Sequence, residues 1–147
     1  MMQNNPNLYI TPISKKDGDK HKPNRNYQLQ LENCKKGLSM YWDGPGPHCK
    51  NSKIKICADD YFMFWRYNEY VNIHKILNIL DPICRLPSWS EDIGHRDRPV
   101  LELSSNYETI LWDDYITNFD GYKRCMSTRR VIEKRSKKII DFLTQEF

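Results

Sequence analysis

The segment from Arg85 to Arg98, RLPSWSEDIGHRDR, holds the densest set of chemically active side chains in the sequence. Its three arginines carry planar guanidinium groups, which match phosphate oxygens and base edges. They are Arg85, Arg96 and Arg98. Trp89 offers an aromatic face on which a base can stack, for about 1–3 kcal/mol per base, and Ser88 and Asp92 can hydrogen-bond a base edge. The segment therefore indicates a site for nucleic acid or a nucleotide.

The same segment also has a structural interpretation, because its arginines alternate with Glu91, Asp92 and Asp97. A network of arginines and carboxylates can make a long loop rigid without binding a ligand. The two interpretations are compatible, and both stay open. His95 is the weak candidate for a catalytic acid or base, but no nucleophile pattern, carboxylate pair, phosphate-binding loop or dinucleotide motif accompanies it. Binding is favoured over catalysis.

Trp42 is a second aromatic candidate, since it adjoins the run Asp43-Gly44-Pro45-Gly46-Pro47. Gly and Pro stop regular structure, so this run is expected to form a surface loop. Trp42 is therefore a candidate for the wall of a pocket at that loop, with a core position as the alternative, and Ser39 is expected to read a polar base edge. Trp65 and Trp112 are expected in the core.

Length and charge limit the classes of protein to which the chain can belong. Its 147 residues suit one domain, and a net charge of +4 is too small to prove a polyanionic partner. The sequence has no apolar stretch of membrane-spanning length and no secretory signal, so an intracellular protein without a membrane partner is expected. The five cysteines lack the paired spacing of zinc sites, and neither a metal nor a cofactor is predicted.

Hydrophobic periodicity predicts an α+β domain over residues 26–147, after a polar tail or loosely held strand over residues 1–25. Strands are predicted at 27–31, 38–42, around Ile54 and Ile56, at 100–104, and in a central hairpin over 61–79. Residues 81–99 are predicted to form a functional loop, and residues 106–118 a helix capped by Asn106. The last twenty residues are predicted to form a helix with one apolar and one basic face. That basic face could follow a phosphate backbone or simply be solvated.

The run Asp59 to Trp65, the reversal after it and the strand Val71 to Ile76 resemble the barrel centre of PUA-like domains of the EVE type. In that family a turn with an acidic residue leads into an apolar strand, and the next strand crosses the barrel. The extended piece Gly37 to Trp42 resembles the stretch that helps to form the family's nucleic-acid pocket. The resemblance covers roughly residues 27 to 128. The glycine that usually precedes the acidic residue is replaced here by Asp59.

The resemblance implies a small mixed or antiparallel β-barrel with short helices, and a nucleic acid or nucleotide as the partner. Relatives of the EVE type, including YTH and ASCH domains, bind RNA or modified bases in an aromatic-lined cavity. For this chain it implies that Trp42 and Trp89 recognise a flipped or modified base, with backbone contacts from the arginines. Two rival functions remain: an enzyme that cleaves a nucleotide phosphodiester with His95 as acid or base, and a structural protein, for instance a viral assembly component, that binds another protein.

Overall fold

The computed structural model describes residues 6–13, 27–44, 56–80 and 99–145. In chain order, the elements in these ranges are β1 (Leu8–Pro12), α2 (Tyr27–Lys35), β2 (Met40–Asp43), β3 (Tyr61–Arg66), β4 (Tyr70–Leu80), β5 (Val100–Leu111), α3 (Trp112–Asn118), β6 (Arg129–Arg130) and α4 (Glu133–Leu143). None of the described helices is long and apolar enough to cross a membrane.

The strands form one mixed sheet in the order β2-β5-β4-β3-β1-β6. β1 runs parallel to β3, and the other neighbouring strands are antiparallel. β2 and β6 are the edge strands and do not pair with each other within the described residues, so the sheet is open there. The α+β class and the mixed sheet agree with expectation, whereas closure into a barrel is not a feature of the described residues.

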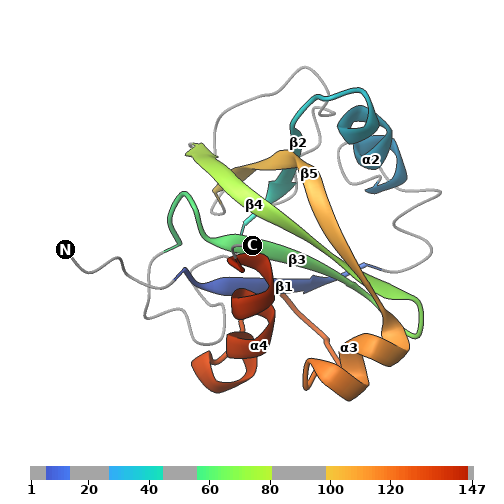
Figure 1. The fold of residues 1–147 in the computed structure, drawn as a ribbon. Helices are drawn as coiled ribbons and strands as arrows, with labels where there is room; N and C mark the ends of the chain where they lie inside the picture. Colours follow the sequence, from blue (N-terminus) through green and yellow to red (C-terminus); the bar gives the residue numbers. More distant parts are fainter. Residues whose placement is uncertain (1–5, 14–26, 45–55, 81–98, 146–147) are drawn as a thin grey trace.

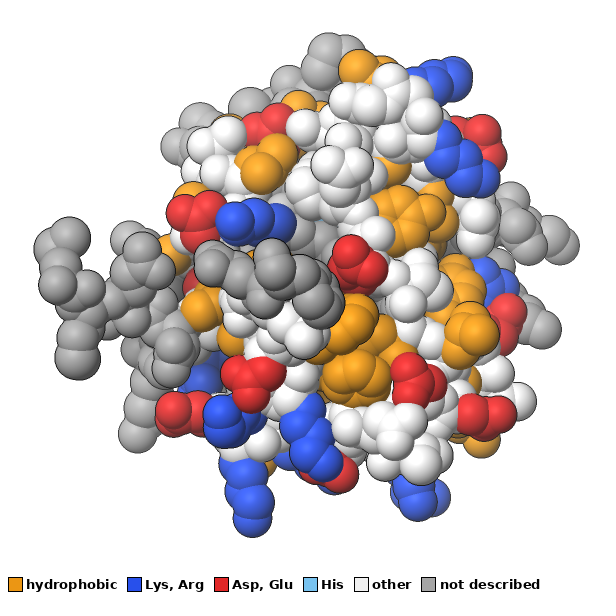
Figure 2. Space-filling view, viewed as in Figure 1, with side chains coloured by type: hydrophobic (Ala, Val, Ile, Leu, Met, Phe, Trp, Pro, Cys, Tyr) orange, Lys and Arg blue, Asp and Glu red, His pale blue; other side chains and the backbone are white. Residues whose placement is uncertain are grey.

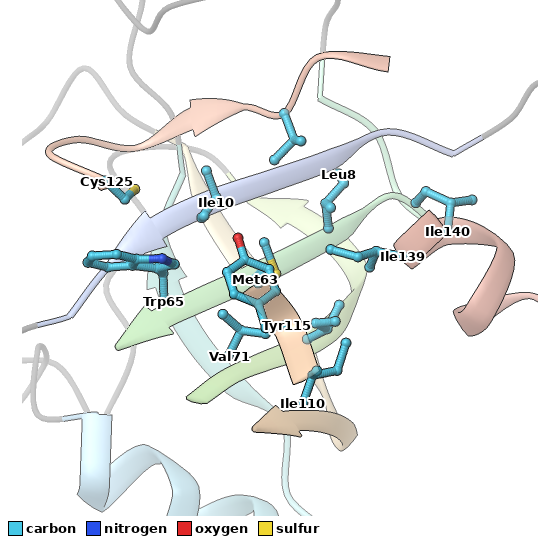
Figure 3. Close-up of a cluster of buried hydrophobic side chains, with 12 residues drawn as sticks. Leu8, Ile10, Met63, Trp65, Val71, Ile110, Tyr115, Cys125, Ile139 and Ile140 are labelled. Carbon is cyan, nitrogen blue, oxygen red and sulfur yellow. The ribbon is translucent and has the colours of Figure 1, made fainter. Parts of the chain in front are cut away.

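Helices cover both faces of the sheet (Figure 1), with α2 on one face and α3 and α4 on the other. Side chains alternate between the faces along each strand. In β3, Phe62 and Phe64 join the core beneath α2, and Met63 and Trp65 join the core beneath α3 and α4. Figure 3 shows this second core, in which Tyr115, Ile139 and Ile140 pack beside Met63.

The central hairpin predicted from residues 61–79 is confirmed as β3 and β4, which pair from Tyr61↔Lys75 to Arg66↔Tyr70. The turn between them is closed by a hydrogen bond from the Glu69 N–H to the Arg66 carbonyl (3.1 Å). Asn68 has a φ of 59°, a conformation that asparagine tolerates better than most residues. The strand predicted at 38–42 is also present, as β2, although it begins at Met40.

The strand predicted at 27–31 is wrong, because these residues begin the helix α2. The buried residues of α2 are Tyr27, Gln30, Leu31 and Cys34. Their spacing of three and four residues is that of one helix face. Leu29, which made the sequence seem to alternate, is 53% exposed. The buried Gln30 therefore concealed the helical period.

The helix predicted at 106–118 is correct only for its second half. β5 continues to Leu111 and pairs with β4 as far as Tyr70↔Leu111, so Asn106 lies in a strand and caps no helix. The ladder of hydrogen bonds with β4 outweighs the helical spacing of the apolar residues. α3 begins only at Trp112, where the backbone N–H donates to the Glu69 carbonyl (3.1 Å).

The two ends of the described chain are both integrated into the fold. In β1, which was expected to be a tail or a loosely held strand, Leu8 and Ile10 are fully buried and the strand pairs with both β3 and β6. The C-terminal helix is confirmed as α4, with Ile139 and Ile140 buried. Its predicted start was too early, since Arg129 and Arg130 form β6. The strand predicted around Ile54 and Ile56 lies mostly outside the described residues.

Candidate nucleic-acid interface

Trp42 lies on the edge strand β2, opposite Leu101, and is half-buried on the α2 face of the sheet. Its ring meets Phe64 at a centroid distance of 5.1 Å and Tyr27 at 6.1 Å, each with an interplanar angle of 88°. Edge-to-face pairs of this kind are favourable because the positive edge of one ring meets the negative face of the other. Two rings therefore anchor the indole, while part of its surface remains open to solvent.

The Tyr27 ring, which supports Trp42, is fixed by a partly buried chain of hydrogen bonds across three elements. Asn72 Nδ2 on β4 donates to the Tyr27 hydroxyl on α2 (2.9 Å), and Thr109 Oγ1 on β5 donates to Asn72 Oδ1 (2.6 Å). Burial raises the pKa of Tyr27 well above its usual range. The phenol therefore stays neutral, and the chain ties α2 to the middle of the sheet.

His74 lies fully buried in the same layer, stacked on Tyr107 (4.8 Å, 27°) and edge-on to Phe64 (5.5 Å, 88°). Its Nδ1 is 2.9 Å from the Ser104 carbonyl oxygen. A carbonyl only accepts, so Nδ1 carries the hydrogen and Nε2 is left as an acceptor. Burial lowers the pKa of His74 to about 4, which makes the ring neutral at pH 7. Nε2 accepts no hydrogen bond from any described residue.

α2 and β2 are joined close to Trp42. The Tyr41 N–H donates to Oε1 of the buried Gln30 (3.4 Å), and Ser39 lies half-buried just before β2. At the other end of β2, the Gly44 N–H donates to the Pro99 carbonyl (2.7 Å). A Cβ atom on Gly44 would lie 3.0 Å from Pro99 Cγ, so the close approach of these two segments depends on glycine.

The residues that flank the arginine-rich segment lie at the same end of the sheet as Trp42. Leu80 and Asp43 both pair with Val100, on its two sides. The segment itself, with its candidates Arg85, Ser88, Trp89, Asp92, His95, Arg96 and Arg98, lies outside the described residues. Of the candidates predicted from the sequence, Ser39 and Trp42 are described, and both lie beside β2.

The described part of this site presents aromatic surface and fixed polar groups. It offers a partly open indole, a row of aromatic rings behind it, and polar groups held in fixed positions. The imidazole of His74 is buried and neutral at pH 7, because burial lowers its pKa to about 4. Among the described residues, no cluster of three or more His, Cys, Asp and Glu is placed to hold a metal ion.

Sequence reasoning assigned Tyr27 to a strand and did not include Asn72 among the candidates, whereas it interpreted His74 in the central hairpin as structural rather than catalytic. The sequence did contain a pattern that could have identified Asn72 and His74. Asn72 and His74 alternate with Val71 and Ile73 in the predicted central hairpin, so their side chains share one face of that strand. Polar residues at such positions need partners within the protein.

No family model matches the chain, and no curated protein matches it. Among solved structures, it is similar to the N-terminal domain of Thermococcus gammatolerans McrB bound to m5C DNA. The TM-score is 0.57 and the identity 14%, over 93% of this chain and 96% of that chain. At this identity the likeness concerns the fold.

Proposed function

We propose that the protein is a nucleic-acid-binding module that recognises a modified base, such as a methylated cytosine, at the Trp42 end of the sheet. The observation that carries the proposal is the likeness, over 93% of the chain, to a domain bound to m5C DNA. Assignment to the EVE type within the PUA-like superfamily is part of the same proposal.

The geometry around Trp42 supports a site for a planar ligand. The indole is half-buried, so it can offer ring surface to a base while Phe64 and Tyr27 hold it in place. A stacking surface that is already fixed loses little conformational freedom on binding. Leu80 and Val100, which stand on either side of residues 81–99 in the sequence, pair with each other, and Val100 also pairs with Asp43 of β2.

In the proposed complex, Trp42 and Trp89 stack on the base, and three polar side chains read its edge. These are Ser39, Ser88 and Asp92. The arginines hold the flanking phosphates, as guanidinium forks match phosphate oxygens. They are Arg85, Arg96 and Arg98. The rival enzymatic function depends on His95, and no observation on the described residues supports that role.

The proposal is tested by fluorescence anisotropy with a labelled DNA duplex that contains one central 5-methylcytosine, compared with the same duplex containing cytosine. The wild-type protein is expected to bind the methylated duplex more tightly. Each of Arg85→Ala, Arg96→Ala and Arg98→Ala should flatten the slope of log K against log salt by about 0.9, the value for one phosphate contact on duplex DNA.

Trp42→Ala should weaken binding of the methylated duplex by about 1–3 kcal/mol. Trp42→Phe keeps a ring against Phe64 and Tyr27, so it tests the stacking surface with less disturbance of the packing. Thermal melting of both variants shows whether they are folded. Leu38→Ala, at a neighbouring residue that is 56% exposed, is the control. Equal affinity of wild type and folded Trp42→Ala, or no preference for the methylated duplex, would contradict the proposal.

A further inference from the structure

An open cavity of about 490 Å³ lies beside the β3–β4 turn. Trp65, Tyr67 and Trp112 line one side of it, and residues 123–126 line the other. Trp65 belongs to the core beneath α3 and α4, whereas Trp42 belongs to the α2 side. The cavity is therefore on the opposite face of the sheet from the Trp42 site.

The three aromatic rings form one continuous wall. The Trp112 ring lies 5.4 Å from that of Trp65 and 5.3 Å from that of Tyr67, at interplanar angles of 68° and 70°. Trp65 is 7% exposed, and its indole N–H donates to the Tyr122 carbonyl (2.8 Å). Tyr67, in contrast, is 65% exposed. The wall therefore has a fixed base in the core and an outer ring that is open to a ligand.

Hydrogen bonds hold this wall in place. The Glu69 N–H closes the β3–β4 turn, and the Glu69 carbonyl accepts from the Trp112 N–H at the start of α3. Tyr67 and Trp112 are therefore kept together by the backbone as well as by their rings. On the opposite side, a Cβ atom on Gly121 would lie 2.3 Å from the Tyr115 ring, so the loop that carries residues 123–126 lies tightly against α3.

Two basic residues, Lys123 and Arg124, lie at the rim of the cavity. Lys123 and Arg124 are exposed, and neither forms an ion pair with a described residue. Residues 123–138 contain eight Lys and Arg and a single Glu, a net charge of +7, while the whole chain carries +4, so all other residues together carry −3. In Figure 2, Lys and Arg side chains project from the lower edge of the molecule, where α4 and α3 lie in Figure 1.

The basic region continues next to the cavity in an ordered arrangement. The guanidinium groups of Arg129 and Arg135 each lie 4.4 Å from the centre of the Tyr122 ring. Tyr122 is the residue whose carbonyl accepts from Trp65. Cation–π contacts of this kind orient the two arginines, and the positive charge therefore adjoins the aromatic wall.

We propose that this cavity is a second site, which binds single-stranded nucleic acid. A base stacks on the exposed ring of Tyr67, with the Trp112 ring edge-on to that of Tyr67 (70°), and the phosphates beside the base contact Lys123 and Arg124. An exposed aromatic ring next to two cations that form no ion pair with a described residue suits a ligand that is planar and anionic, such as a nucleotide unit. A cavity of this size is in the range of about 300–1,000 Å³ found for ligand sites. The inference goes beyond the modified-base site, because its residues are on the other face.

The test measures binding of fluorescein-labelled decathymidylate by anisotropy over a range of salt concentrations. Tyr67→Ala should weaken binding at least about fivefold, the lower limit for loss of one stacked base. Tyr67→Phe keeps the ring and should bind as the wild type does. Tyr67 is mostly exposed, so thermal melting should show that both variants stay folded.

Lys123→Glu should flatten the slope of log K against log salt by about 0.7, the value for one phosphate contact on a single strand. Lys75→Glu is the control of equal charge. Lys75 pairs with Tyr61, at the other end of the β3–β4 ladder from Trp65. Tyr61 and Trp65 are four residues apart along β3, which is about 13 Å at about 3.3 Å per residue. Lys75→Glu should leave the slope nearly unchanged.

Separate outcomes distinguish this site from the Trp42 site. Trp42→Ala should not change decathymidylate binding, and failure of the methylated duplex to bind would leave this proposal intact. Wild-type affinity in both Tyr67→Ala and Lys123→Glu would overturn it. The proposal would also be overturned if a polyglutamate peptide bound in place of decathymidylate and the same two variants lost this binding. The site would then accept an acidic peptide.

Discussion

The two faces of the sheet handle polar groups in opposite ways. Beneath α2, the side chains of Gln30, Asn72 and His74 are each no more than 4% exposed and lie among aromatic rings. Beneath α3 and α4 the core cluster consists of hydrophobic residues, with Ser136 of α4 as a buried polar residue, and the charged groups Lys123 and Arg124 lie at the rim of the cavity. Sealed polar groups hold the rings around them in one geometry. Exposed cations give long-range attraction that depends on salt.

This contrast suggests different roles for the two faces. The α2 face has the fixed geometry that discrimination between similar bases requires, since a misplaced hydrogen-bonding group is costly there. The other face has the charge and the open stacking surface that binding without sequence preference requires. Both are built on β3, whose successive residues Phe64 and Trp65 point to opposite sides. The predictions below separate the two faces.

The largest effect is expected from Phe64→Ala. The Phe64 ring lies within 5.5 Å of the rings of Tyr27, Trp42 and His74, and it is fully buried. Its removal should lower the free energy of unfolding by about 3–5 kcal/mol, as measured by urea denaturation.

Met63→Ala is the matched variant on the other face, with an expected loss of about 2–5 kcal/mol. If the faces act separately, Phe64→Ala should reduce binding of the methylated duplex far more than Met63→Ala does, at temperatures where both are folded. Equal losses of binding would mean that the α2 face has no special role.

A pH effect should arise from His74. Its pKa is about 4 in the folded protein and 6.5 ordinarily, so between these values the unfolded chain binds a proton that the folded one does not. Stability should therefore be complete above about pH 6.5, fall as the pH drops toward 4, and then level off, with a total loss on the order of 3 kcal/mol.

Urea denaturation between pH 4 and pH 7 measures this loss. His74→Phe keeps a ring against Phe64 and Tyr107 and removes the titration. The difference in pH dependence between the wild type and His74→Phe gives the contribution of His74 separately from that of the other three histidines in the chain. Equal pH dependence in both would show that His74 is accessible to protons in the native state.

Tyr27→Phe should have a smaller effect. The substitution leaves Asn72 Nδ2 without its buried acceptor, which should cost about 1–3 kcal/mol in the free energy of unfolding. Tyr107→Phe removes a hydroxyl from a half-buried ring on the same face and serves as the control. Destabilisation by Tyr27→Phe no greater than that by Tyr107→Phe would mean that the hydrogen-bond chain does not hold α2 on the sheet.

Local sequence patterns predicted the elements correctly where the apolar residues follow a single period, that of a strand or that of a helix. The run Tyr61 to Trp65 and the alternation after Val71 identified the hairpin, and the apolar face of α4 identified the C-terminal helix. The pattern failed for α2 because a buried glutamine, Gln30, occupies its core face. It failed for residues 106–111 because pairing with β4 is a long-range interaction that no local period records.

The candidate site was predictable in part, for a related reason. Trp42 was identified because a loop of Gly and Pro follows it, which is a local signal. Its neighbours Tyr27 and Phe64 come from α2 and β3, and no spacing in the sequence brings them together. The cavity beside Tyr67 was not predicted at all, since its wall combines a turn, a helix start and the loop at residues 123–126.

The smallest effect concerns Asp59, in the turn that leads into β3 and so serves both faces. The φ of Asp59 is 73°, in the left-handed region that glycine favours. Asp59→Gly and Asp59→Ala both remove the exposed ion pair with Lys75 (3.7 Å), so the difference between them reports the backbone alone. Asp59→Ala should be less stable than Asp59→Gly by about 1 kcal/mol, because the left-handed conformation disfavours a Cβ atom.

Urea denaturation of the two variants measures this difference. Equal stability would mean that the turn changes conformation when the aspartate is replaced, and that the entry into β3 is not held by this residue.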